Sequence, residues 1–317
     1  MIEWRLLPED VARIKFAFSP LWELMLSMVA LRLPSEHSLH LPWVRATRPL
    51  VADLDLTEIF ALAPAHGWIA DFLTPAPTEP LPDITTELEA VRRTAPEQVV
   101  ADIADVPNVP AEVAARISAD PGAALERIAG TLRVYWDTAL AEHWPRIVRL
   151  LEADVMWRSQ RLATGGVQAL FLDLHDTITL EGDRLSAADP FDYAGELSGS
   201  GLTLVPHAMG WPRVRKMIEP YQPMIAYPAR GVATLWETAP PPPPDALSSL
   251  IGKTRAGLLI TLAEPASTTA LAHRLRVTPG AISQHLSILL ACGLVARTRV
   301  AGSVLYHRTT RGDALTD

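Results

Sequence analysis

The polar residues with the most regular spacing lie in 278–293, TPGAISQHLSILLACG. Gly280, Ser283, Gln284 and Ser287 would share one face of a helix, and this face is small, uncharged and rich in hydrogen-bonding groups. A glutamine amide can pair bidentately with adenine, and serine hydroxyls adapt to base edges and phosphates. The pattern therefore indicates a surface that can lie against nucleic acid.

A second group of residues that could bind a metal or transfer protons is Asp173, His175 and Asp176 in FLDLHDT, with His207 further along the chain. Positions 173 and 175 would share one face of a strand, so a metal or acid/base site is conceivable. However, the sequence has no His-x-Glu-x-x-His spacing, Gly-rich phosphate loop or Gly-x-Ser-x-Gly elbow. Asp and Thr are also common where a strand turns. We therefore expect no catalytic residue, no metal site and no cofactor.

The stretch 278–293 has the N-cap, the apolar spacing and the C-terminal glycine that are typical of an α-helix. Thr278 is a good N-cap, Pro279 fits the first helical position, and Gly293 is a natural C-terminal stop. The opposite face is an apolar stripe with helical spacing, formed by Ile282, Leu286, Leu289 and Leu290.

The flanking sequence predicts a winged helix-turn-helix. A short helix over 268–275 and a turn at 276–277 precede the helix described above. Two alternating segments, 294–299 and 303–308, predict a β-hairpin wing, and 247–262 predicts a helix in front.

These segments together resemble the winged helix-turn-helix of the ArsR/SmtB-type bacterial transcription regulators. The resemblance is carried by KTRAGLLITLAEP (253–265), TTALAHRLRVTPGAISQHLSILLACGLV (268–295) and RTRVAGSVLYHRT (297–309). It implies a homodimer that binds double-stranded DNA, with the helix 278–291 in the major groove and an inverted-repeat operator. The residues expected to contact DNA are Lys253, Thr278, Pro279, Gly280, Ser283, Gln284, Ser287, Arg297, Arg299 and Arg308.

The founding members of that family sense metals through cysteines, but this chain has a single cysteine, Cys292, in the apolar run LLACGLV. We expect Cys292 to be a small core residue, and metal sensing is not carried over.

Charge is divided unevenly along the chain, whose formal net charge is −8. Residues 245–317 hold eight Lys/Arg and four Asp/Glu, which gives +4, and residues 1–244 hold the other 20 basic and 32 acidic residues, which gives −12. A basic module on an acidic body fits nucleic-acid binding confined to one end.

The fold class expected for the whole chain is α+β. The domains are a sensor or dimerisation body at 1–239, a polyproline linker at 240–244 and the DNA-binding domain at 245–317. Helices are expected over 1–165, including all of 1–75, and mainly strands of an antiparallel sheet over 166–237. The expected strands are 167–174, 177–180, 184–186, 201–205 and 223–227.

The body also resembles an uncharacterised actinobacterial domain found ahead of ArsR-type modules. The resemblance covers most of 1–240 and is carried by FSPLWELMLS (18–27), GLTLVPHAMGWPRV (201–214) and IAYPARGVATLWE (225–237). It adds no chemistry.

All nine tryptophans lie in 1–244. They suggest an aromatic pocket for a small apolar effector, with ordinary core and dimer contacts as the alternative. The residues expected to line this pocket are Trp22, Met25, Trp136, Trp157 and Trp211.

The sequence as a whole predicts a cytoplasmic, non-enzymatic transcription regulator that acts as a ligand-responsive repressor. The chain start has no signal-peptide hydrophobic region, and no apolar run approaches the ~18 residues of a membrane span. One alternative is a regulator controlled by a protein partner with no small ligand. A more distant alternative is an enzyme fused to a DNA-binding module.

Overall fold

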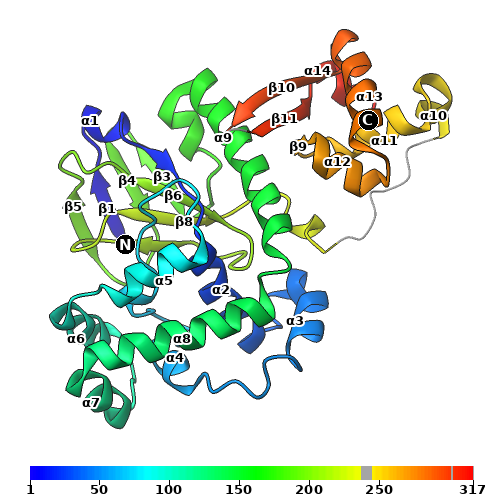
Figure 1. The fold of residues 1–317 in the computed structure, drawn as a ribbon. Coiled ribbons are helices and arrows are strands. Elements are labelled where there is room, and N and C mark those ends of the chain that lie inside the picture. The colour runs from blue at the N-terminus through cyan, green and yellow to red at the C-terminus, as the bar shows by residue number, and fades with distance from the viewer. Residues whose placement is uncertain (237–244, 301–302, 317) are drawn as a thin grey trace.

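The computed structural model describes residues 1–236, 245–300 and 303–316. A large body, 1–236, carries a smaller module, 245–316, at one side (Figure 1). The proline run 240–244 and the expected wing turn at 301–302 lie outside the described residues. The α+β class is confirmed, because both parts combine helices with sheets.

Helices make up most of the first half of the body. They are α1 (Pro8–Val11), α2 (Pro20–Arg32), α3 (Leu41–Thr47), α4 (Thr57–Leu62), α5 (Ile84–Arg92), α6 (Pro96–Asp105), α7 (Ala111–Ala119), α8 (Pro121–Ala139) and α9 (Trp144–Phe171). Three 3₁₀ turns accompany them: η1 (Ser38–His40), η2 (Asp71–Leu73) and η3 (Val232–Thr234).

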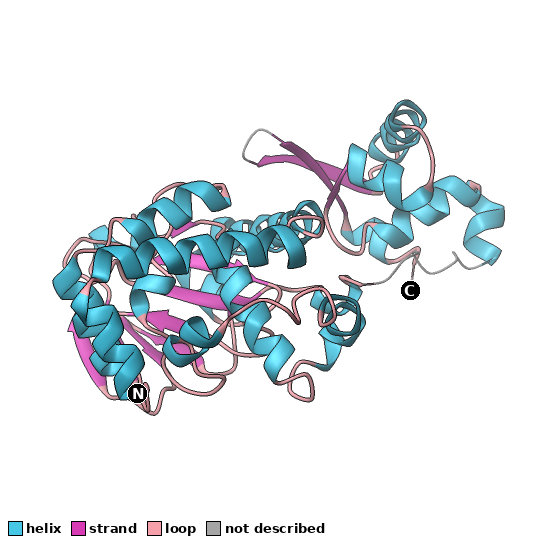
Figure 2. Ribbon diagram, turned by 60° about the horizontal axis from the view of Figure 1, so that its bottom comes forward, coloured by secondary structure: helices cyan, strands magenta, loops and turns pink. Residues whose placement is uncertain are grey.

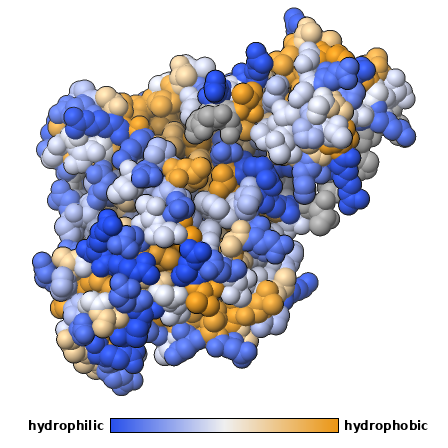
Figure 3. Space-filling model, in the orientation of Figure 1, coloured by the Kyte–Doolittle hydropathy of each residue, from blue (hydrophilic) through white to orange (hydrophobic). Residues whose placement is uncertain are grey.

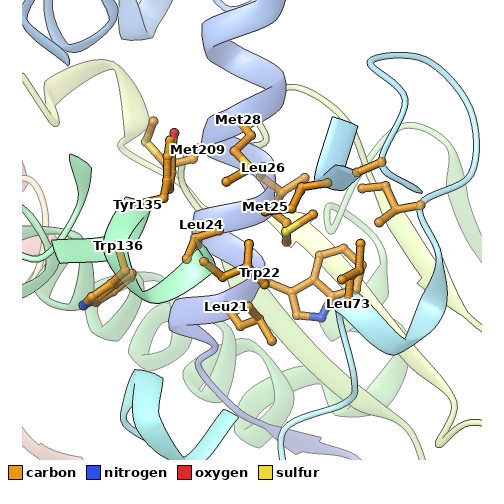
Figure 4. Close-up of a cluster of buried hydrophobic side chains, with 14 of the residues drawn as sticks. Leu21, Trp22, Leu24, Met25, Leu26, Met28, Leu73, Tyr135, Trp136 and Met209 are labelled. Carbon is orange, nitrogen blue, oxygen red and sulfur yellow. The ribbon is translucent and has the colours of Figure 1, made fainter. Parts of the chain in front are cut away.

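Helix α2 is the centre of the larger core. The Ser19 side chain accepts a hydrogen bond from the Trp22 amide at 2.9 Å, and Pro20 fills the first position. All twelve residues of 20–31 are buried. Figure 4 shows side chains of α2 packed among residues of distant segments: Leu21, Leu24, Met25 and Met28 with Leu73, Tyr135 and Met209.

Two four-stranded sheets complete the body, with strand orders β3-β4-β1-β5 and β2-β6-β8-β7. The strands are β1 (Ile2–Arg5), β2 (Lys15–Phe16), β3 (Ile178–Glu181), β4 (Arg184–Ala187), β5 (Tyr193–Glu196), β6 (Thr203–His207), β7 (Arg215–Met217) and β8 (Met224–Pro228). The expected antiparallel sheet is corrected to mixed sheets, because β1–β5, β2–β6 and β6–β8 pair in parallel.

The assignment of helices to all of 1–75 is wrong at β1 and β2. Strand β1 buries Ile2 and Trp4 and pairs with residues 179 to 191 positions later, which a local pattern cannot reveal. The strand expected at 167–174 is also wrong. Gly166, with φ of 68°, kinks α9, and the chain then continues as helix to Phe171. A short apolar run does not distinguish a buried strand from a buried helical turn.

The C-terminal module has the predicted order of helices and wing. Its elements are α10 (Asp245–Ile251), α11 (Lys253–Thr261), β9 (Ala266–Ser267), α12 (Thr268–Leu275), α13 (Pro279–Ala291), β10 (Val295–Val300), β11 (Ser303–Arg308) and α14 (Thr310–Asp313). The single helix expected over 247–262 is two helices, because Gly252 adopts φ of 87° between them. The strand order in the module is β10-β11-β9.

The module has a hydrophobic core of its own, separate from the two clusters of the body. Figure 2 shows helices outside the sheets of the body and the wing strands extending from the module. On the face drawn in Figure 3, hydrophobic residues form several small patches between hydrophilic ones. Within the described residues, no helix has both the length and the apolar character that crossing a bilayer requires.

Candidate nucleic-acid interface

The inner face of α13 is packed as its spacing predicts. The Thr278 side chain accepts a hydrogen bond from the Ala281 amide at 3.4 Å, so the predicted N-cap is present. Ile282, Leu286 and Leu289 are 0%, 0% and 1% exposed in the module core. This packing fixes which side of α13 faces outward.

The outer face of α13 carries Gly280, Ser283, Gln284 and Ser287, and all four are exposed. We call these four residues the recognition face. The Ser287 hydroxyl donates to the Ser283 carbonyl oxygen at 2.9 Å, so its oxygen remains an acceptor toward solvent. A short polar surface on a rigid, core-anchored helix suits contact with base edges in a groove.

The turn before α13 orients that face. Ser267 caps α12 by accepting from the Ala270 amide at 3.2 Å, and Arg276 ends α12 in the left-handed conformation with φ of 54°. Arg276 is exposed and lies in the turn directly before α13, the helix that carries the recognition face. The predicted DNA contacts omitted Arg276, although a basic residue in the turn was visible in the sequence.

The predicted cationic contacts divide into two groups. Arg297 and Arg299 are exposed on β10, and Lys253 is exposed at the start of α11. Arg308 is instead 18% exposed, with its Nε 2.8 Å from Asp313 Oδ1 and its Nη1 2.7 Å from Thr316 Oγ1. The structure thus gives Arg308 partners in and beside α14, while its phosphate contact stays a prediction.

Replacing Arg299 with Ala should weaken binding to every DNA sequence alike and reduce the salt slope of log K by about one unit. The reason is that each phosphate contact releases counterions on binding. Titrations between low and moderate salt measure this slope, with Arg184→Ala, an exposed arginine of the body, as the matched control. A slope identical to that of the parent protein would place Arg299 away from the DNA backbone.

Cys292 is exposed, so its assignment to the core is wrong. It is the C-cap of α13, and Gly293, with φ of 67°, then turns the chain so that Val295 enters the core. Within the described residues, no group of three or more His, Cys, Asp or Glu side chains could hold a metal ion.

Cys292→Ser should leave DNA affinity within about twofold of the parent protein, because an exposed thiol contributes little packing. Micromolar Zn(II), Cd(II) or As(III) should not release DNA from either protein. Electrophoretic mobility shifts with and without each metal check this expectation. Release of DNA by metal in the parent protein that disappears in the variant would assign Cys292 a sensing role.

The structure does not gather the five residues expected to form an effector pocket. Met25 and Trp136 are buried in the main core, and Trp211 packs at its edge. Trp157 lies on α9 with the Arg230 guanidinium 3.9 Å from its ring centroid. Trp22 alone lines the cavity described next.

A cavity in the body, which we call the body cavity, has a volume of about 840 Å³. Its walls come from the segment around η2, from α6, from β7 and from the loop after β4. Trp22, Trp68 and Phe191 supply aromatic surface, and the rings of the last two lie 6.1 Å apart. The size and the mixed lining are typical of small-molecule sites.

Among the described residues, five carboxyl-bearing side chains line the cavity: Asp71, Asp102, Asp105, Asp189 and Glu219. Asp102 is 4% exposed. It accepts hydrogen bonds from the Phe72 backbone amide at 2.7 Å, the Tyr221 hydroxyl at 2.5 Å and the Gln98 side-chain amide at 2.6 Å. Burial raises the pKa of Asp102 above its usual range. Burial and the neighbouring Asp102 charge raise the pKa of Asp71 to about 7.

Among the described residues, two of the three basic side chains of the cavity are ion-paired, and the third, Arg215, has only a backbone partner. Lys216 Nζ lies 2.6 Å from Asp189, and Arg213 Nη2 lies 2.6 Å from Glu36. Arg215 donates to the Gly67 carbonyl oxygen at 3.1 Å, and burial lowers the pKa of its guanidinium.

The body and the module meet beside α9. Strand β10 packs against α9 (Figure 1). Glu264, in the turn before β9, is half-buried next to the body, and the charge of Arg230 opposes the rise in pKa that burial causes at Glu264. A Cβ at Gly231 would lie 3.3 Å from the Glu264 carboxyl carbon, so these two segments of the chain pass close to each other here.

Asp154 on α9 anchors the same junction. It is 1% exposed and accepts from the Arg158 Nε at 3.0 Å, the Tyr227 hydroxyl at 2.8 Å and the Arg230 amide at 3.0 Å. The segment that touches the module is thereby fixed to α9.

The residues weighed for an acid/base site do not form a group. Residues 173–176 form a turn between α9 and β3, and not the strand that a chelate required. His175 is bonded to Thr177 Oγ1 at 2.8 Å and the Pro212 carbonyl oxygen at 2.9 Å. His207 is fully buried, and burial lowers its pKa to about 3, so it is neutral.

The winged helix-turn-helix with its outward recognition face defines the module as part of a DNA-binding transcription regulator. Residues 253–297 match the family model described as bacterial regulatory protein, arsR family. Residues 97–233 match a family of unknown function, DUF5937. No curated protein and no solved structure matches the chain. The protein therefore carries an ArsR-family DNA-binding domain preceded by a DUF5937 domain.

Proposed function

We propose that this protein is a cytoplasmic transcriptional repressor that binds an inverted-repeat operator as a homodimer and releases it when the body binds a small molecule. The observation that carries the proposal is the exposed polar face of α13, held on a packed ArsR-family module beside the exposed Arg297 and Arg299. The proposal assigns no chemical reaction to the chain.

Symmetry supports the dimer. One recognition helix reads about half a helical turn of DNA, and two helices related by a twofold axis read successive major grooves. Leu250 on α10 is 70% exposed and would offer an apolar side chain to a second copy.

A continuous set of contacts supports control by the body. Strand β7 lines the cavity and pairs with β8. Strand β8 leads into Arg230 and Gly231, which lie against Glu264 of the module. A ligand that shifts β7 can thus change how the module sits against α9, and allostery requires such a differential contact.

A reporter experiment tests the sign of regulation. Promoters bound by the protein are identified by genome-wide mapping, and each drives a reporter in cells with and without the gene. Deletion should raise expression at least severalfold, and the full chain should restore repression. Expression that falls on deletion would make the protein an activator.

Control by a protein partner is the second candidate. Leu172, after the end of α9, is 78% exposed, and Phe191 at the cavity rim is 52% exposed. A partner that covers both would regulate the module without a small ligand. In that case purified protein would stay bound to DNA whatever compound is added, and would be released only by the partner.

A further inference from the structure

The body cavity has an excess of acidic groups without counter-charges. Within the described residues, neither Asp71 nor Asp102 has a basic side chain among the groups that shift its pKa, whereas Lys216 and Arg213 are ion-paired at 2.6 Å. Arg215 donates only to a backbone carbonyl oxygen. The lining still holds more acidic than basic side chains, namely Asp71, Asp102, Asp105, Asp189 and Glu219 against Arg213, Arg215 and Lys216. A carboxylate that is withdrawn from water and has hydrogen bonds but no counter-charge is costly to ionise, and a bound cation would offset that cost.

The aromatic wall lies in the same cavity as these carboxyls. The pKa of Asp71 is influenced by a hydrogen bond from the Trp68 side chain, so indole and carboxyl are adjacent. Trp22 is 3% exposed, and its Nε1 is buried without a hydrogen-bond partner among the described residues. Figure 4 shows its indole extending from α2 toward Leu73, in the η2 turn that begins at Asp71. Aromatic faces attract cations through their quadrupole, most strongly where water is excluded.

We propose that this cavity binds a small organic cation, with a protonated amine or quaternary ammonium group held by Asp71 and Asp102 and an apolar or aromatic skeleton against Trp22, Trp68 and Phe191. The volume of about 840 Å³ accommodates a drug-sized molecule. The inference deepens the proposed function by naming the effector class, and it rests on that function only for the release of DNA.

Calorimetry on the full chain, without DNA, tests the ligand class with three probes of one skeleton. The probes are phenethylamine, 2-phenylethanol and 3-phenylpropionate, which are cationic, neutral and anionic at neutral pH. The amine should bind at least tenfold more tightly than either of the other two. Equal or tighter binding of the alcohol or the carboxylate, or no binding of the amine at millimolar concentration, would overturn the proposal.

Variants assign the groups. Asp71→Asn should remove the preference for the amine over the alcohol, because it removes the charge and keeps the shape. Trp68→Ala should weaken both probes. Asp137→Asn is the matched control, since Asp137 is an exposed aspartate on α8 that pairs with Arg133. A preference that survives Asp71→Asn would contradict the assignment of the amine to this carboxyl.

Proton balance gives a readout that needs no variant. Near pH 6, Asp71 is mostly protonated, because burial and the neighbouring Asp102 and Asp105 raise its pKa to about 7, and the hydrogen bond from Trp68 offsets this only in part. Binding an amine should ionise Asp71 and release a proton, which calorimetry in buffers of different ionisation enthalpy detects. Proton uptake, or no exchange, would mean that the amine does not pair with Asp71.

Operator DNA separates this inference from the proposed function. If the amine binds and DNA affinity is unchanged, the cavity assignment stands and the effector role of the body fails. If an anionic or neutral compound binds the cavity and releases DNA, the effector role stands and the ligand class fails.

Discussion

Leu286→Ala should lower the free energy of unfolding of the C-terminal module by about 2–5 kcal/mol. Leu286 lies on the inner face of α13, is 0% exposed and packs in the module core. Truncation of its side chain therefore opens a cavity that neighbouring helices fill only partly. A module of this size has little stability to lose, and DNA binding should fall with its folded fraction. Thermal and denaturant unfolding of the full chain, followed by circular dichroism, measures the loss.

Gln284→Ala is the matched comparison on the same helix. Gln284 is exposed, so the variant should melt within about 0.5 kcal/mol of the parent protein. It should cost about 1–3 kcal/mol on the specific site and relax the preference at one base pair per half-site. Non-specific binding should barely change, because phosphate contacts dominate it. A variant that loses stability and keeps its base preference would show that α13 faces the other way.

Asp154→Ala should destabilise the body by about 3–5 kcal/mol, because it leaves Arg158 buried without its carboxylate. Arg158 is 1% exposed, and its other acidic neighbour, Asp173, lies at 3.7 Å and is 43% exposed. The loss also frees the Tyr227 hydroxyl and the Arg230 amide. Unfolding of the body, followed by tryptophan fluorescence, reports the change.

The control for this prediction is Asp173→Asn, which removes the exposed carboxylate near the same guanidinium. It should cost less than about 1 kcal/mol, as exposed ion pairs do. If the two variants destabilise the body equally, the account of Asp154 as the anchor of α9 and β8 is wrong.

The order of the helices and the two-stranded wing of the C-terminal module could be predicted from the sequence, because their signals are local, whereas β9 and α14 were not predicted. Thr278 and Pro279 start α13, the apolar spacing orients it, and Gly293 ends it. The error at Gly252 has a local cause as well, since one glycine with φ of 87° divides an otherwise continuous helical pattern.

The sheets of the body could not be predicted to the same extent, because their pairings are long-range. Strand β1 pairs with β4 and β5 across nearly the whole body, and β2 pairs with β6. Each of these early strands has four residues or fewer, which is too short for a periodic signal.

The two candidate sites differ in the same way. The recognition face consists of residues within one helix, so its composition and its orientation were readable together. The cavity joins Trp22 from α2, Asp71 from η2, Asp102 from α6 and Phe191 from the loop after β4. Tryptophan content indicated aromatic surface in the body, but only the fold reveals which tryptophans meet carboxyl groups.

Selection of bound sequences from a random duplex library by the full chain, repeated with Gln284→Ala, tests directly whether α13 reads DNA as part of a dimer. If α13 reads DNA as part of a dimer, the selected sites should be inverted repeats with half-site centres about ten base pairs apart. The variant should select the same spacing with one degenerate position in each half-site. Selection of asymmetric single sites, or of no consensus at all, would contradict the account.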